Sequence, residues 1–152
     1  MYVKILVPID GSETSAMGLN EAVRLAKNQG ARIRLVHVVN ELLVLLPDAY
    51  INMGRVIDEL RRTGKIVLET AESSVRSAGV QVDTTLIEAM GNQAGVQIVR
   101  QAQEWGADLI VCGTHGRRGI RRIVMGSDAE YIVRHTPVPI LLIRSAGEPP
   151  IP

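Results

Sequence analysis

One segment of the sequence, residues 113–127, combines the residue types that bind phosphate groups. It contains four arginines and no acidic residue, and its four glycines are Gly113, Gly116, Gly119 and Gly126. Glycine lets the backbone bend and approach a ligand closely. Gly126 and Ser127 directly precede a predicted helix, whose N–H groups and positive dipole end attract anions. The segment therefore predicts a phosphate-binding loop that leads into a helix N-terminus.

Two common nucleotide-binding patterns do not occur in the sequence. A Walker A loop ends in Gly-Lys-Ser/Thr, but no lysine follows Lys65. A dinucleotide fingerprint needs Gly-x-Gly-x-x-Gly after the first strand, and Asp10–Glu13 lacks it. The alternative for the glycine segment is a long turn without a ligand, although such connections usually take about 2–6 residues. His115 lies in the segment, but the sequence pairs it with no nucleophile, which argues against a catalytic role.

Five short apolar runs alternate with four amphipathic stretches along the chain. The runs span residues 3–9, 32–39, 80–87, 108–112 and 138–143, and all except the third are nearly continuous in Val, Ile and Leu. Continuous runs are typical of parallel strands that are buried on both faces, whereas the alternating third run is typical of an edge strand. The amphipathic stretches predict helices over residues 13–29, 48–78, 93–105 and 128–135.

The predicted helices carry signals for their ends and their buried faces. Ser12 or Thr14 is expected to cap the first helix, and Ser127 the fourth. Gly54 and Gly64 weaken the second helix, so we expect it to bend or break. The buried face of the first helix is predicted to comprise Ala16, Leu19, Val23 and Ala26.

The strict alternation of strands and helices predicts an α/β fold with one parallel sheet covered on both faces. Ligands of such sheets bind at the carboxyl ends of the strands, where the winding direction switches. The first and fourth predicted strands end in the two conspicuous polar segments, residues 8–12 and 113–127. A switch between these strands would bring both segments to one crevice. Asp10, in the first segment, either caps the following helix or contacts the ligand.

The composition excludes several classes of protein. The chain has 152 residues, of which 46% are hydrophobic, and its formal net charge of +1 argues against a nucleic-acid partner. No apolar run reaches the roughly 18–20 residues that span a bilayer, and no signal peptide is recognisable, so we expect a cytoplasmic protein. The single cysteine, Cys112, excludes an intramolecular disulfide. One domain is expected at residues 1–145, followed by a flexible, Pro-rich tail at residues 146–152.

Three separated motifs resemble those of the universal stress protein family. The glycine segment matches the pattern of the nucleotide-binding branch of the family, with the spacing Gly113-x2-Gly116-x9-Gly126-Ser127. The opening Ile5–Ser12 and the close Pro137–Arg144 are similar to the first and last strands of the family. The resemblance covers about residues 2–145. It implies a single-domain, three-layer fold with a five-stranded parallel sheet in the order 3-2-1-4-5.

The same resemblance implies that the chain binds ATP together with Mg²⁺ and forms a homodimer through its last strand, Val138–Arg144. The adenosine end of the implied site comprises Pro8, Ile9, Asp10 and Val38. The phosphate end comprises Cys112, Gly113, His115, Gly116, Gly126, Ser127 and Asp128. The carboxylate of Asp128 favours the helix dipole, but it repels a triphosphate unless it points away or shares the Mg²⁺ ion.

Three functions are compatible with these features. The first is an ATP-binding universal stress protein that regulates the stress response and is not a dedicated enzyme. The second is a slow ATP hydrolase or phosphoryl-transfer protein, which would need Asp10, Asp128 or His115 as base or metal ligand. The third is a nucleotide-free dimeric interaction module, as in the other branch of the family. That branch lacks the glycine spacing that this chain has, so we favour the regulator.

Overall fold

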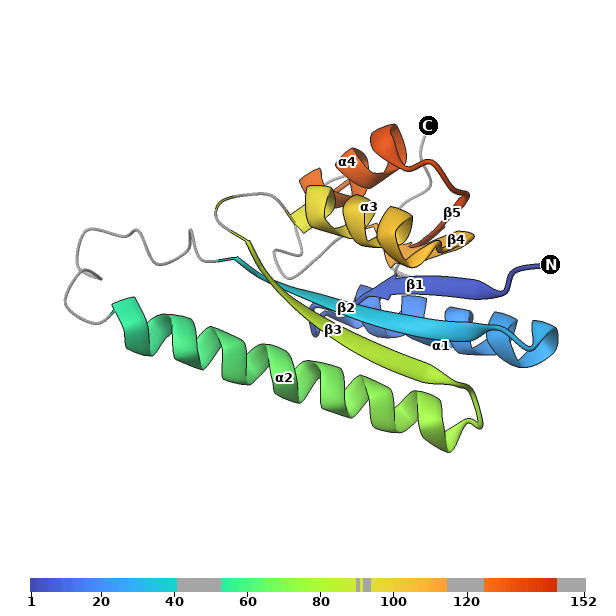
Figure 1. The fold of residues 1–152 in the computed structure, drawn as a ribbon, viewed down its shortest axis with the longest axis horizontal. Helices are drawn as coiled ribbons and strands as arrows, with labels where there is room; N and C mark the ends of the chain where they lie inside the picture. Colours follow the sequence, from blue (N-terminus) through green and yellow to red (C-terminus); the bar gives the residue numbers. More distant parts are fainter. Residues whose placement is uncertain (41–52, 90, 92–93, 115–124, 145–152) are drawn as a thin grey trace.

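A computed structural model describes residues 1–40, 53–89, 91, 94–114 and 125–144, and strands and helices alternate along them (Figure 1). The strands are β1 (Lys4–Pro8), β2 (Arg32–Asn40), β3 (Val82–Ala89), β4 (Leu109–Gly113) and β5 (Ile140–Ile143). The helices are α1 (Glu13–Gln29), α2 (Met53–Ser77), α3 (Ala94–Trp105) and α4 (Ser127–His135). The predicted order of elements is confirmed.

The strands form one parallel sheet in the order β3-β2-β1-β4-β5, as predicted. Helices α1 and α2 cover one face of the sheet, and α3 and α4 cover the other (Figure 1). The third strand lies at an edge, as its alternating sequence predicts. The winding reverses between β1 and β4, which are hydrogen-bonded neighbours with Ile5 opposite Leu109. The carboxyl ends of the strands face the left-hand side of Figure 1.

Each face of the sheet has its own hydrophobic core, because successive residues of a strand point to opposite faces. In β1, Ile5 and Val7 join the core beneath α1 and α2, whereas Leu6 joins the core beneath α3 and α4. All three side chains are fully buried, and burial of one such side chain contributes about 1.5–3 kcal/mol. This burial on two sides explains why the strand is a continuous apolar run.

Helix α1 begins as predicted and buries its predicted face except at Ala16. Its N-cap is Ser12, whose hydroxyl oxygen accepts a hydrogen bond from the Ser15 N–H. Leu19 and Ala26 are buried as expected, whereas Ala16 is exposed, so that part of the prediction is wrong. The buried stripe is rotated toward β4 and includes small residues that permit close packing, namely Thr14, Ser15, Gly18 and Ala22.

Helix α2 continues through Gly64 without interruption, so the predicted break is wrong. A Cβ atom at Gly64 would lie 2.6 Å from Cδ2 of His37 and 2.9 Å from Cδ1 of Leu86. The missing side chain therefore allows α2 to lie directly on β2 and β3, and this packing outweighs the low helix propensity of glycine. The expected start of the helix, residues 48–52, lies outside the described residues. None of the described helices is long and apolar enough to cross a membrane.

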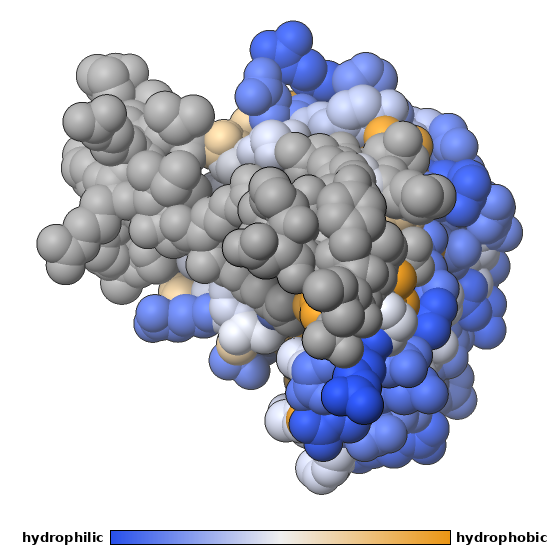
Figure 2. Space-filling view, turned by 90° about the vertical axis from the view of Figure 1, so that its left-hand side faces the viewer, coloured by the Kyte–Doolittle hydropathy of each residue, from blue (hydrophilic) through white to orange (hydrophobic). Residues whose placement is uncertain are grey.

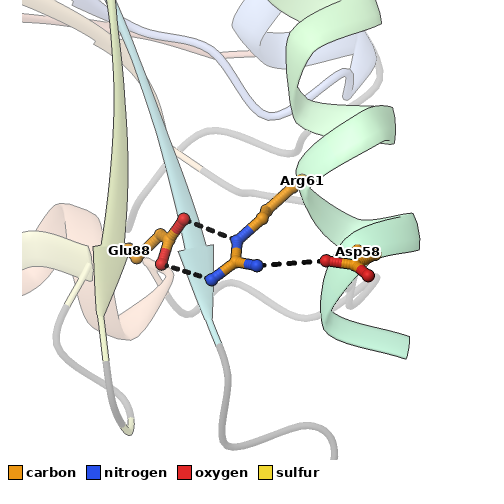
Figure 3. Close-up of polar contacts among 3 residues, drawn as sticks. All are labelled: Asp58, Arg61 and Glu88. Carbon is orange, nitrogen blue, oxygen red and sulfur yellow. Dashed lines mark hydrogen bonds and ion pairs between the residues drawn. The ribbon is translucent and has the colours of Figure 1, made fainter. Parts of the chain in front are cut away.

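An ion-pair cluster fastens α2 to the end of β3 (Figure 3). The guanidinium of Arg61 donates two hydrogen bonds to Glu88, at 2.6 and 2.9 Å, and a third to Asp58 at 3.1 Å. The carboxylate of Glu88, as the main cause, raises the pKa of Arg61. Bidentate geometry adds specificity to such a pair, although exposed pairs contribute little to stability. The cluster fixes where the first half of α2 lies along the edge strand.

Candidate functional site

The switch point between β1 and β4 brings the two predicted polar segments together. Gly113, at the end of β4, lies against Thr14 in the first turn of α1, where an added Cβ atom would be 2.8 Å from Cβ of Thr14. Gly18, one turn further along α1, lies beside the backbone of Cys112. The approach at Gly113 leaves no room for a side chain, whereas a Cβ atom at Gly18 would make only an ordinary contact at 3.7 Å. The start of α1 and the end of β4 therefore form adjacent walls at the carboxyl edge of the sheet.

The turn after β1 is fixed by its own side chains. The carboxylate of Asp10 accepts a hydrogen bond from the Ser12 N–H at 2.9 Å, and Ser12 in turn caps α1. Gly11 between them has a φ of 82°, a backbone angle that residues other than glycine rarely adopt. The sequence offered Asp10, Ser12 and Thr14 as candidates for the cap of the first helix, and Ser12 supplies it. Asp10 shapes the turn that leads to it.

Two hydrogen bonds hold the end of β1 against β2. The Ile9 N–H donates to the Val36 carbonyl at 2.8 Å, and the Ile9 carbonyl is 2.7 Å from Nδ1 of His37. His37 is buried, and this contact supplies the hydrogen-bond partner that a buried histidine needs. Val38, the next residue of β2, is half-buried beside this junction. The expected adenosine end of the site is thus built where the end of β1 is hydrogen-bonded to β2.

The two ends of the glycine segment are joined to each other. The Gly126 N–H donates to the Thr114 carbonyl at 2.9 Å, and the Thr114 N–H donates to the Ile143 carbonyl at 2.9 Å. The predicted phosphate contacts His115 and Gly116, together with the four arginines, lie outside the described residues. The two ends of the glycine segment therefore lie together at the carboxyl ends of β4 and β5.

Helix α4 starts at the end of the glycine segment, and its N-cap residue makes no side-chain hydrogen bond. Its N-cap is Gly126, which makes no side-chain hydrogen bond to the first turn, and its first helical residue is Ser127. The prediction that Ser127 caps the helix is therefore wrong, because the helix begins one residue earlier than the apolar pattern indicates. The first N–H groups of a helix have no partner within the helix, and the helix dipole adds positive potential there. This end of α4 can accept an anion.

Asp128, also expected at the phosphate end, makes a contact that the sequence did not predict. One of its carboxylate oxygens accepts a hydrogen bond from the Gly95 N–H, in the first turn of α3, at 2.9 Å. Its acidic group therefore contacts the neighbouring helix. Gly95, like Thr114, was missed by sequence reasoning, although a glycine near the start of a predicted helix is a sign of close packing.

The remaining predicted contacts lie at the ends of the central strands. Cys112 is buried, and burial raises the pKa of its thiol to about 12, so it is a neutral core residue at physiological pH. Pro8 is half-buried at the end of β1, opposite Val36 of β2. Among the described residues, no group of three or more His, Cys, Asp or Glu side chains could hold a metal ion.

The described surface at the carboxyl edge is mostly hydrophilic, with small hydrophobic areas (Figure 2). A doubly wound sheet, a switch point between its central strands and a helix N-terminus open to an anion define an α/β protein of the class that binds ligands at this edge. Residues 1–144 match the universal stress protein family, and the chain belongs to that family.

Individual relatives match over nearly the whole chain. Universal stress protein YxiE from Bacillus subtilis is 35% identical, over 95% of this chain and 100% of its own length. The solved structure of universal stress protein UspA from Lactobacillus plantarum is 25% identical, with a TM-score of 0.82, over 94% of this chain and 98% of that one. A universal stress protein from Archaeoglobus fulgidus, solved in complex with dAMP, is 27% identical, with a TM-score of 0.69, over 93% and 98% of the two chains.

Proposed function

We propose that this chain binds an adenine nucleotide, ATP, at the carboxyl edge of its sheet. The observation that carries the proposal is the start of α4, where the N-cap is a glycine, which has no side chain to accept a hydrogen bond from the first turn. A bound phosphate would supply the missing acceptor and would lie at the positive end of the helix dipole. The dAMP complex of the Archaeoglobus relative supports an adenine nucleotide as the ligand.

Most of the expected contacts have a role in this proposal. The end of β1 and Val38 border the adenosine, since they flank the junction of β1 and β2. Gly113 lets the chain pass close to the ribose and phosphates, and Gly126 and Ser127 hold the phosphates at the start of α4. His115 and Gly116 complete the phosphate end by their place in the family pattern.

Mg²⁺ fits this site as the companion of the nucleotide. Magnesium is usually held by one or two carboxylates together with the phosphates of the ligand and water. Asp10 lies at the carboxyl edge of the sheet, in the turn between β1 and α1, where such a carboxylate is needed. When bound, the ion would neutralise part of the phosphate charge.

We further propose that nucleotide binding serves regulation in the stress response, in the cytoplasm, and that two copies associate through β5. β5 is an edge strand, and all four of its residues are partly exposed. An edge strand has unpaired backbone groups that a second copy can pair with. Sedimentation of the purified protein tests the dimer, and a monomer at micromolar concentration would contradict it.

Calorimetric titration with ATP, in the presence of Mg²⁺, tests the proposed ligand. We expect saturable binding with one site per chain, and chromatography of nucleotide released from the denatured protein should yield an adenine nucleotide. A protein that carries none and binds none at millimolar ATP would contradict the proposal. Rapid hydrolysis that an Asp10→Asn substitution abolishes would instead favour an enzyme over a regulator.

A further inference from the structure

The N-termini of α3 and α4 lie unusually close together. Gly95 is the second residue of α3, and a Cβ atom there would be 3.0 Å from the carbonyl oxygen of Asp128 and 3.0 Å from Cβ of Tyr131. A larger residue at this position would push the two helices apart. Two positive helix ends therefore meet at the edge of the sheet that carries the proposed nucleotide site.

The carboxylate of Asp128 lies between these two helix ends. It accepts the Gly95 N–H at 2.9 Å, so a residue of α4 supplies an acceptor that the first turn of α3 lacks. The other acidic residue in the first turn of α4, Glu130, is paired with Arg134 at 2.7 Å. The negative charge of Glu130 is thus offset within α4, whereas Asp128 is held by a neutral backbone amide.

This position gives Asp128 a second effect. It directly follows Ser127, the residue at which the phosphates are proposed to bind. A fixed negative charge near a bound phosphate makes the free energy of binding less favourable, in proportion to the charge of that phosphate group. The same charge partly cancels the positive potential of the α4 N-terminus.

We propose that Asp128 both fixes α3 against α4 and limits the phosphate charge that the site accepts. The residue is a positioning and specificity-determining residue, which lowers the preference for a triphosphate over a monophosphate. The inference rests on the proposed function, because it concerns the same site. It deepens that function by assigning the selectivity among adenine nucleotides to one carboxylate.

The decisive variant is Asp128→Asn, because its side-chain oxygen can still accept the Gly95 N–H while the charge is removed. Affinities for adenosine, AMP and ATP are measured by calorimetry at low salt in EDTA, so that the phosphates keep their full charge. We expect ATP to bind roughly five- to tenfold more tightly to the variant, AMP roughly two- to threefold, and adenosine equally. Added salt should reduce these gains. Glu104→Gln, which removes one charge at the far end of α3, is the matched control and should leave all three affinities unchanged.

The second arm separates the cap from the charge. Asp128→Ala removes both, so its Tm should fall about 2–4 °C below that of Asp128→Asn. Equal Tm values for Asp128→Ala and Asp128→Asn would contradict the proposal that Asp128 fixes α3 against α4. An equal change for adenosine, AMP and ATP, or no ATP binding by Asp128→Asn in EDTA, would overturn the charge selectivity while ATP binding with Mg²⁺ still supported the proposed function. Failure of every variant and of the natural protein to bind any adenine nucleotide, with or without Mg²⁺, would overturn both proposals.

Discussion

Helices α1 and α4 begin at the same edge of the sheet, but their first turns are completed in different ways. At α1 the hydroxyl of Ser12 accepts the Ser15 N–H at 3.2 Å. At α4 the equivalent position is Gly126, which offers no side-chain acceptor. We call the start of α1 closed, because a side chain of the protein accepts one of its N–H groups. We call the start of α4 open, because its N-cap residue has no side chain to do so.

The difference shows how one structural element serves stability in one place and binding in another. A side-chain cap is worth about 1 kcal/mol, and the α1 cap contributes this to the folded state. At α4 the glycine N-cap forgoes only a few tenths of a kcal/mol of that stabilisation, and it leaves the first N–H donors for an anion. The start of α1 lies directly against the end of β4, because Gly113 leaves room there for Thr14.

The largest expected effect comes from separating the start of α1 from the end of β4. Gly113→Ala places a Cβ atom 2.8 Å from Cβ of Thr14 and 3.0 Å from its carbonyl carbon. Because backbone has to move, we expect a loss of about 1–3 kcal/mol in the free energy of unfolding, measured by urea denaturation. Gly54→Ala is the matched control, since nothing lies within 4 Å of its added Cβ atom. Stability should be unchanged or higher in that variant, and an equal loss in both would contradict the close-approach account.

Removal of the hydroxyl at the open helix start should affect binding without affecting stability. For Ser127→Ala we expect roughly tenfold weaker ATP binding by calorimetry, because a hydrogen bond to a charged phosphate is lost. The free energy of unfolding should stay within about 0.5 kcal/mol, since Ser127 is exposed and is not the N-cap of α4. Unchanged ATP affinity would remove Ser127 from the site.

The closed helix start should respond through stability. Ser12→Ala removes the α1 cap, so we expect the free energy of unfolding to fall by about 1 kcal/mol. The measurement is chemical denaturation of the nucleotide-free protein, with Ser127→Ala as the reciprocal control. If both substitutions had the same effect on stability, the contrast between the two helices would be wrong.

The smallest expected effect comes from converting the open start into a closed one. Gly126 has φ −60° and ψ 146°, values that serine adopts freely, and serine is a preferred N-cap residue. Gly126→Ser should stabilise the nucleotide-free protein by a few tenths of a kcal/mol. Its hydroxyl would compete with the phosphate, so ATP affinity should fall roughly two- to threefold. Thermal unfolding and calorimetry on the same sample check both, and tighter ATP binding would contradict the account.

The architecture could be predicted from the sequence because burial on two faces leaves a continuous apolar pattern in β1, β2 and β4. The fifth run has the same pattern, but the expectation that it is buried on both faces is wrong, because β5 is an edge strand whose residues are partly exposed. The α1 cap was predictable for a similar reason, since capping is decided by residues close together in the chain. The contacts of Gly64 and Gly95 were not predicted, because each depends on which helix the fold places against the glycine. The partner of Asp128 was missed for the same reason: it lies 33 residues away on α3.

The most direct test of the central claim is a ¹H–¹⁵N spectrum of the protein titrated with ATP and Mg²⁺. The account predicts that the backbone amide signals of Ser127, Asp128 and Ala129, in the first turn of α4, shift on saturation. The amide of Ser15, already bonded to the Ser12 hydroxyl, should move much less. Saturable ATP binding that shifts the first turn of α1 and leaves that of α4 unchanged would contradict it.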